Sequence, residues 1–189
     1  MRRDAFRGEC SRKMPMKLAT TVCALLLLAI AVPATAAPQP AKPVPANLYT
    51  GRWYEIARTP NHLQIDCEAS TTDFSGWVAG VFSAVQTCHS GAPGGPKRTV
   101  TVQGHVLPES QNAKMQLAML GGLISKEYWI LDRSQDNAWL IMATPDARYV
   151  WLMSRQPVLS AAARAAAMSR MQALGFNLGR LAFPQQLAR

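Results

Sequence analysis

The chain has 189 residues, of which 49% are hydrophobic and 16% are charged, a composition that excludes an intrinsically disordered protein and predicts one globular domain. Its formal charge is +9, but residues 1–37 hold six basic and two acidic residues and so account for +4, which leaves +5 on the remainder. The basic residues of that remainder are scattered and form no stripe, so we expect no nucleic-acid partner.

The N-terminal 37 residues have the three parts of an export signal. A basic region ends at Lys17, an apolar run covers residues 18–32, and small residues occupy positions 34–37. We therefore predict a cleaved signal peptide over residues 1–37. Residues 1–13 are not translated if synthesis starts at an internal methionine.

Two of the four cysteines lie inside the expected signal peptide. Cys23 lacks the small residue that normally precedes a lipid-modified cysteine, so we expect it to be removed with the signal, and lipoprotein anchoring is the disfavoured alternative. Removal leaves Cys67 and Cys88, an even pair in an oxidising compartment. A disulfide between them is predicted.

The mature chain begins with a linker and continues as one domain. Residues 38–46 are too rich in proline to be expected to pack and are interpreted as an extended tether. Over residues 47–186, runs with the alternation of strands are separated by turn residues. The runs are 53–58, two strands of a hairpin within 67–88, then 98–107, 114–119, 127–132, 139–143 and 149–154. Eight strands at hairpin spacing predict an antiparallel barrel or sandwich.

The cysteine pair suggests a register for the hairpin. If Cys67 and Cys88 face each other, the turn is centred on residues 77–78, between glycines. The same register places Phe74 and Val85 on one face, opposite to the face of the cysteines.

The pattern changes to a helix after the last strand. Ser160 can cap an alanine-rich segment that ends at Gly175. One face of this helix is expected to pack on the outside of the sheet; it contains Ala161, Ala165, Met168, Met171 and Leu174.

Four stretches in the expected order resemble the lipocalins, specifically the bacterial lipocalin family related to apolipoprotein D. They are G-R-W-Y-E-I-A-R at 51–58, C-E-A-S-T-T-D-F at 67–74 with its partner Cys88, N-A-K at 112–114 with Y-W-I-L-D at 128–132, and Y-V-W-L-M-S-R-Q-P at 149–157. The resemblance implies an all-β fold, an eight-stranded antiparallel up-and-down barrel with one C-terminal α-helix packed outside.

The resemblance also implies structural roles for Gly51, Trp53, Asp132 and Arg155. Trp53 would close the floor of the barrel, and the guanidinium of Arg155 would stack on its indole. Alternation along the strands puts Asp132 on the same face as Tyr128 and Ile130. The residues expected to line the barrel interior are Tyr128, Ile130, Trp151, Met153, Tyr149, Met115, Leu117, Met119, Phe74 and Val85.

The implied function is non-catalytic binding, transport or storage of hydrophobic ligands, such as fatty acids or lysophospholipids, in the bacterial cell envelope, either in the periplasm or as a secreted protein. No cofactor is expected, and the three histidines lack the spacing of metal ligands. One alternative is an enzyme that uses the thiol of Cys67, which a disulfide would block. Another is a protein-interaction module at the barrel mouth, where residues 60–66 and 120–126 could equally touch membrane lipid. The oligomeric state stays open.

Overall fold

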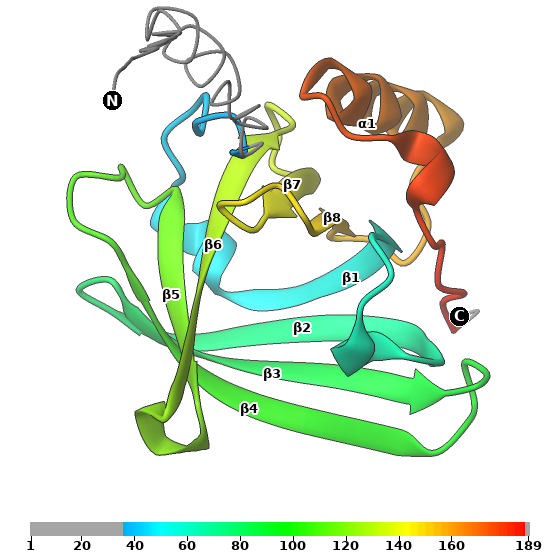
Figure 1. Cartoon of the computed structure of the whole chain (residues 1–189), viewed down its shortest axis with the longest axis horizontal. Helices are drawn as coiled ribbons and strands as arrows, with labels where there is room; N and C mark the ends of the chain where they lie inside the picture. The colour runs from blue at the N-terminus through cyan, green and yellow to red at the C-terminus, as the bar shows by residue number, and fades with distance from the viewer. Residues whose placement is uncertain (1–35, 188–189) are drawn as a thin grey trace, which may run out of the picture. The chain divides into compact units, whose positions relative to one another are not determined.

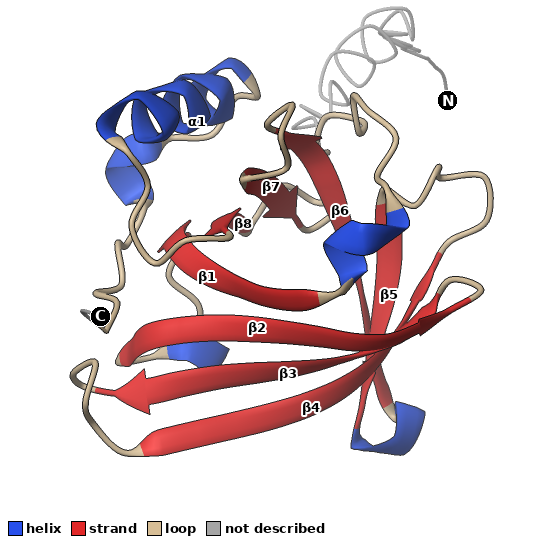
Figure 2. Ribbon diagram, turned by 180° about the vertical axis from the view of Figure 1, so that it is seen from behind, coloured by secondary structure: helices blue, strands red, loops and turns tan. Residues whose placement is uncertain are grey.

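Eight antiparallel strands close into a barrel in which each strand pairs with its neighbour in sequence and β1 pairs with β8 (Figures 1 and 2). The strands are β1 (Gly51–Arg58), β2 (Cys67–Val78), β3 (Val81–Ser90), β4 (Lys97–Val106), β5 (Lys114–Met119), β6 (Ile124–Arg133), β7 (Trp139–Ala143) and β8 (Val150–Ser154). Short 3-10 helices are η1 (Ala46–Tyr49), η2 (His62–Gln64), η3 (Leu120–Gly122) and η4 (Leu178–Arg180). The order confirms the predicted up-and-down barrel.

The computed structural model describes residues 36–187. Residues 1–35 of the expected signal peptide, with Cys10 and Cys23, therefore lie outside the described residues. Within residues 36–187, no helix is long and apolar enough to cross a membrane.

The chain after β8 forms α1 (Ala161–Ala173), which lies outside the barrel near β7 and β8 (Figure 1). The Oγ of Ser160 accepts a hydrogen bond from the backbone N–H of Ala163 at 3.2 Å, and Gly175 follows the helix with a φ of +90°. These are the predicted cap and stop.

The buried face of α1 differs in part from the prediction. Ala167 and Met171 are buried against the outer face of the barrel, whereas Ala161 and Ala165 are exposed. An alanine-rich helix has little contrast between its faces, so the sequence pattern does not fix its rotation.

The hairpin of β2 and β3 does not have the predicted register. Phe74 lies opposite Ala84, and Cys67 lies opposite Ser90. The turn falls on residues 79–80, both with positive φ, two residues beyond the predicted position. The disulfide between Cys67 and Cys88 is nevertheless present, because a register shift between residues 68 and 71 lets the two sulfurs meet from residues that are not paired.

The segment 38–46 was expected not to pack, and this expectation was wrong. Val44 is buried, and its N–H donates to the carbonyl of Gln111 at 2.9 Å. The N–H of Ala41 donates to the carbonyl of Leu131 at 3.1 Å. Prolines lack only the N–H, so the residues between them still anchor the segment to the barrel.

One end of the barrel is closed by η1 and the start of β1. The indole N–H of Trp53 donates to the carbonyl of Leu48 at 2.9 Å, and the guanidinium of Arg155 lies 3.9 Å from the centre of the Trp53 ring. The same guanidinium donates to the carbonyls of Asn47, Thr50 and Arg52 at 2.7–3.1 Å. The stacking inferred from the resemblance is therefore present.

The backbone conformation of Gly51 is part of this closed end. Its φ is +68°, a region that residues with a side chain adopt reluctantly. A Cβ at this position would also stand 3.5 Å from Nη1 of Arg155. That distance is an ordinary contact, so the positive φ, and not a lack of space, is what favours glycine at the start of β1.

Candidate functional site

The barrel encloses a cavity of about 120 Å³, measured as the space open to the centre of a water molecule. This corresponds to roughly ten water positions. Most of its lining is apolar. Among the residues predicted for the interior, those that line the cavity are Phe74, Met115, Leu117, Met119, Tyr128, Ile130, Trp151 and Met153.

Loop connectivity shows where the cavity opens. In an up-and-down barrel, the loops after β1, β3, β5 and β7 share one end, and η1 and Arg155 lie at the other. Leu63, in the loop after β1, and Val100, on β4, line the cavity and are 68% and 49% exposed. The mouth is therefore at the end of the η2 loop, opposite the floor made by Trp53.

Two predicted lining residues do not reach the cavity. Val85 is absent from the lining, which β3 supplies through its neighbours Ala84 and Gln86; the wrong hairpin register reversed the two faces of this strand. Tyr149 precedes β8 in the turn from β7, and its ring packs 6.2 Å from that of Trp151 without lining the cavity. Strand alternation does not extend into a turn.

Asp132 does not share the inward face of Ile130. A register shift between these two residues of β6 turns Asp132 outward, where it pairs with Lys42 at 2.8 Å and with Arg170 of α1. Burial opposes its ionisation, but hydrogen bonds from Lys42, the N–H of Arg133 and Arg170 lower the pKa of this carboxyl overall. The residue fastens the N-terminal segment and α1 to the barrel.

The floor of the cavity is built from aromatic rings that the sequence analysis did not assign. Tyr49 stacks on Trp77 with centroids 4.8 Å apart and lies 4.8 Å from Phe82. Its hydroxyl donates to the carbonyl of Asn112, and burial raises the pKa of Tyr49. Tyr49 precedes the motif at 51–58 by two residues, so its closeness in sequence to Trp53 was the available signal.

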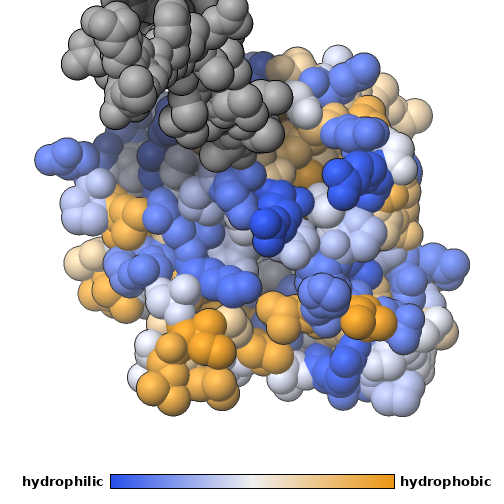
Figure 3. All heavy atoms as spheres, viewed as in Figure 1, coloured by the Kyte–Doolittle hydropathy of each residue, from blue (hydrophilic) through white to orange (hydrophobic). Residues whose placement is uncertain are grey.

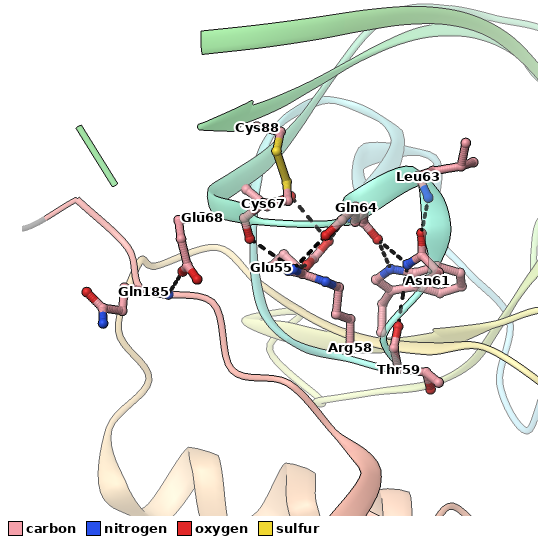
Figure 4. A network of polar contacts seen from close by, with 12 residues as sticks. Glu55, Arg58, Thr59, Asn61, Leu63, Gln64, Cys67, Glu68, Cys88 and Gln185 are labelled. Atoms are coloured by element: carbon pink, nitrogen blue, oxygen red, sulfur yellow. Dashed lines mark hydrogen bonds and ion pairs between the residues drawn. A yellow bond between two sulfur atoms is a disulfide. The ribbon is translucent and has the colours of Figure 1, made fainter. Parts of the chain in front are cut away.

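Near the mouth, a polar network ties the η2 loop to the inner wall (Figure 4). Glu55 accepts from Arg58 at 2.6 Å, from the side-chain amide of Gln64 at 2.6 Å and from Ser70 at 3.2 Å. Burial raises the pKa of Glu55, while these three donors act in the opposite direction. Arg58 also donates to the carbonyls of Gln64 and Cys67 through Nη2, so the two charges are paired with each other, and Nε of Arg58 is the one buried side-chain polar atom of the described chain without a partner.

Gln64 connects this network to the opposite wall. Its side-chain oxygen accepts from Asn61 at 2.7 Å and from the indole N–H of Trp151 at 3.0 Å. Figure 4 shows Asn61, Gln64 and Glu55 pointing toward one another beneath the η2 ribbon. A loop glutamine gives no sequence signal for such a role, because its partners lie 9 and 87 positions away.

Cys67 is bonded to Cys88 and offers no free thiol. In the part of the chain that the structure describes, no group of three or more His, Cys, Asp or Glu residues could hold a metal ion. The arrangement is that of a container with apolar walls, a closed floor and a few polar groups near its mouth.

Comparisons with known proteins agree with this geometry. A family model described as a lipocalin-like domain matches residues 44–186. The chain is 23% identical to the outer membrane lipoprotein Blc of Vibrio cholerae serotype O1 over 141 residues, which cover 74% of this chain and 81% of that protein.

Solved structures share the fold at low sequence identity. Insecticyanin from the tobacco hornworm Manduca sexta aligns with a TM-score of 0.66 and 14% identity over 80% of this chain and 86% of its own. The cockroach allergen Per a 4 aligns with a TM-score of 0.63 and 17% identity over 82% and 96%.

Proposed function

Since the chain belongs to the lipocalin-like domain family, whose members typically bind hydrophobic ligands, we propose that it binds, transports or stores lipids such as fatty acids or lysophospholipids. The observation that carries the proposal is the apolar cavity, which is closed at Trp53 and open beside Leu63. Burial of one methylene contributes about 0.8 kcal/mol. An alkyl chain of about a dozen carbons thus supplies enough for micromolar affinity after the cost of association.

We place this activity in the bacterial cell envelope. The export signal expected over residues 1–37 and the similarity to an outer membrane lipoprotein support an exported protein, in the periplasm or secreted. The family is generally non-catalytic, and the bonded Cys67 gives no support to an enzyme with a thiol nucleophile.

Displacement of a fluorescent fatty-acid probe from the purified mature protein tests the proposal. We expect unlabelled dodecanoate and lysophospholipid to displace the probe at micromolar concentration. Ala84→Phe fills the cavity from a buried lining position and should abolish probe binding. Ala118→Phe is the matched control, because Ala118 alternates with the lining residues of β5 and is absent from the lining. Equal probe binding by both variants, or none by the unaltered barrel, would overturn the proposal.

We further propose that the mouth contacts membrane lipid. Apolar side chains on both sides of the opening are exposed, among them Leu63, Ile65, Leu120 and Leu123. Figure 3 shows apolar surface gathered at the lower left, over the end of the β5–β6 hairpin. Solitary exposed apolar residues are ordinary, but a group around the opening of an apolar cavity is typical of an interaction surface.

Co-sedimentation with phosphatidylethanolamine–phosphatidylglycerol vesicles tests this contact. The double variant Leu120→Ser/Leu123→Ser should release the protein into the supernatant. Val158→Ser is the control, because Val158 is similarly exposed but lies in the segment between β8 and α1 and not in the loops at the mouth. Unchanged sedimentation of the double variant would exclude the contact and favour the protein-interaction interpretation of the mouth.

A further inference from the structure

Three polar side chains on the inner wall have no hydrogen-bond partner among residues 36–187. They are Thr72 on β2, Gln86 on β3 and Tyr128 on β6, and all three line the cavity. Their polar atoms are accessible from the cavity, since the one buried side-chain polar atom without a partner in the described chain is Nε of Arg58. Water or the head of a ligand therefore satisfies these groups.

The positions of Thr72 and Gln86 show where such a head would lie. The two residues are direct partners across β2 and β3, so their side chains stand next to each other on the same face. Gln86 is also paired with Val100 on β4, whose exposure marks the mouth side of the cavity. On its other side Thr72 is paired with Trp53 on β1, so the Thr72–Gln86 pair lies between the floor tryptophan and the mouth, with Gln86 on the mouth side.

The wall below this pair is apolar. Two residues closer to the floor, the inward-facing side chains are Phe74, Ala84 and Val102, which are paired across β2, β3 and β4. Phe82, two residues before Ala84 on β3, belongs to the aromatic cluster at the floor. Four residues of tilted strand separate Gln86 from Phe82, which is a depth of roughly 10 Å along the barrel. In this arrangement an alkyl chain would lie against the apolar row, and a polar head would lie beside the pair.

The charges of the lining decide which head is favoured. Among the described lining residues there is no lysine, arginine or histidine. Glu55 is the one carboxylate in the lining. Arg58 is not a lining residue; its Nη1 and Nη2 donate to Glu55 and to backbone carbonyls, and its Nε is buried without a partner in the described chain. A carboxylate head held here would lose its water without gaining a counter-charge, which is costly for an anion.

We propose that the cavity selects amphiphiles with an uncharged, hydrogen-bonding head, such as a primary alcohol, a glycerol ester or a primary amide, over the fatty carboxylate of the same chain length. The amide of Gln86 and the hydroxyl of Thr72 bind the head, with Tyr128 donating from the opposite wall. Burial raises the pKa of Tyr128, so its hydroxyl stays a donor at neutral pH. This inference rests on the proposed function, because it requires that lipids enter the cavity.

A head-group series at constant chain length tests the inference. Dodecanol, dodecanamide, monododecanoylglycerol and dodecanoate compete with the fluorescent probe at pH 8, where the acid is ionised. The three uncharged ligands should bind at least tenfold more tightly than dodecanoate. Equal or tighter binding of dodecanoate overturns the selection but leaves the lipid-carrier function standing. Failure of all four ligands to bind overturns both.

Two variants test whether Gln86 and Thr72 cause the preference for uncharged heads. Gln86→Leu and Thr72→Val remove the polar groups at nearly constant volume and should weaken binding of dodecanamide at least fivefold without weakening that of dodecanoate. Gln103→Leu makes the same chemical change on the outward face of β4 and should alter neither affinity. Circular dichroism first establishes that each variant is folded. An unchanged ratio of the two affinities in both inner-wall variants refutes the proposed head contact.

Discussion

Replacing Arg155 by lysine keeps the positive charge at the floor but removes the shape of the guanidinium. In the structure this group contacts three carbonyls at 2.7–3.1 Å and covers the ring of Trp53 at 3.9 Å. The carbonyls belong to residues 47, 50 and 52, on both sides of the bend that leads into β1. An ammonium is a compact charge and cannot hold three divergent acceptors in this plane.

The expected loss of stability in Arg155→Lys follows from the contacts that are lost. Each hydrogen bond to a charged donor contributes about 1.5–3 kcal/mol, and a cation–π contact at an exposed site contributes about 0.5–1 kcal/mol. Arg155 is half-buried, so water replaces part of what two lost bonds contributed. We therefore expect Arg155→Lys to lower the free energy of unfolding by roughly 2 kcal/mol.

Urea denaturation followed by tryptophan fluorescence measures this effect. A loss of that size shifts the midpoint by about 1 M for a protein of this size. Arg148→Lys is the matched control, because Arg148 is exposed and its ion pair with Asp146 is long, at 3.8 Å. Probe affinity should stay unchanged in the folded fraction, since Arg155 is not among the lining residues. If the two variants unfold within about 0.2 M of each other, the bracing role of Arg155 is wrong.

Three further changes give independent tests. Gly104→Ala would place a Cβ 2.3 Å from the ring of Phe82, so we expect overpacking to lower the free energy of unfolding by about 1–3 kcal/mol, measured by thermal melts. An unchanged melting temperature would show that the side chains at the floor can rearrange to accommodate the methyl group. Replacing Cys67 and Cys88 together by alanine opens a loop with a sequence separation of 21 and should lower the free energy of unfolding, measured in urea, by about 3 kcal/mol. No change would mean that the pairing of β2 and β3 is sufficient to stabilise this end of the barrel. The pKa of Asp132 is lowered on folding, so its contribution is present above the ordinary carboxyl pKa near 4 and is lost as the pH falls through the folded value. Asp132→Asn should therefore be less stable at pH 7 and show a shallower loss of stability in acid, and parallel pH profiles for the two proteins would contradict this.

The strands and α1 were predictable because their signals are local. Alternation, turn residues and the cap at Ser160 each act within a few positions. The disulfide was predictable as a pairing of the two remaining cysteines. The pairing of the strands around the disulfide was not predictable. The register shift after Glu68 occurs where the N–H of Ala69 donates to the carbonyl of Gln185, a residue 116 positions later in the chain that local sequence does not reveal.

That one irregularity accounts for the wrong choice of lining residue on β3. The inward face of β3 carries Ala84 and Gln86, and the assumed register had selected Val85 in their place. On β5, which has no such irregularity, alternation alone located Met115, Leu117 and Met119 correctly. Lining residues were therefore predicted where no register shift intervenes, and Ala84 and Gln86 on β3 become predictable only once the register is known.

In the η2 loop a polar side chain is buried and apolar side chains are exposed, the reverse of an ordinary surface loop. Gln64 is buried at 6% exposure, while its neighbours Leu63 and Ile65 are 68% and 58% exposed. A buried amide is stable there because Glu55 and Trp151 satisfy it. The exposed leucine and isoleucine gain nothing from water, but they would gain from contact with acyl chains. A loop that is polar toward the cavity and apolar toward the outside is the arrangement that the proposed transfer of a lipid from a membrane into the cavity requires.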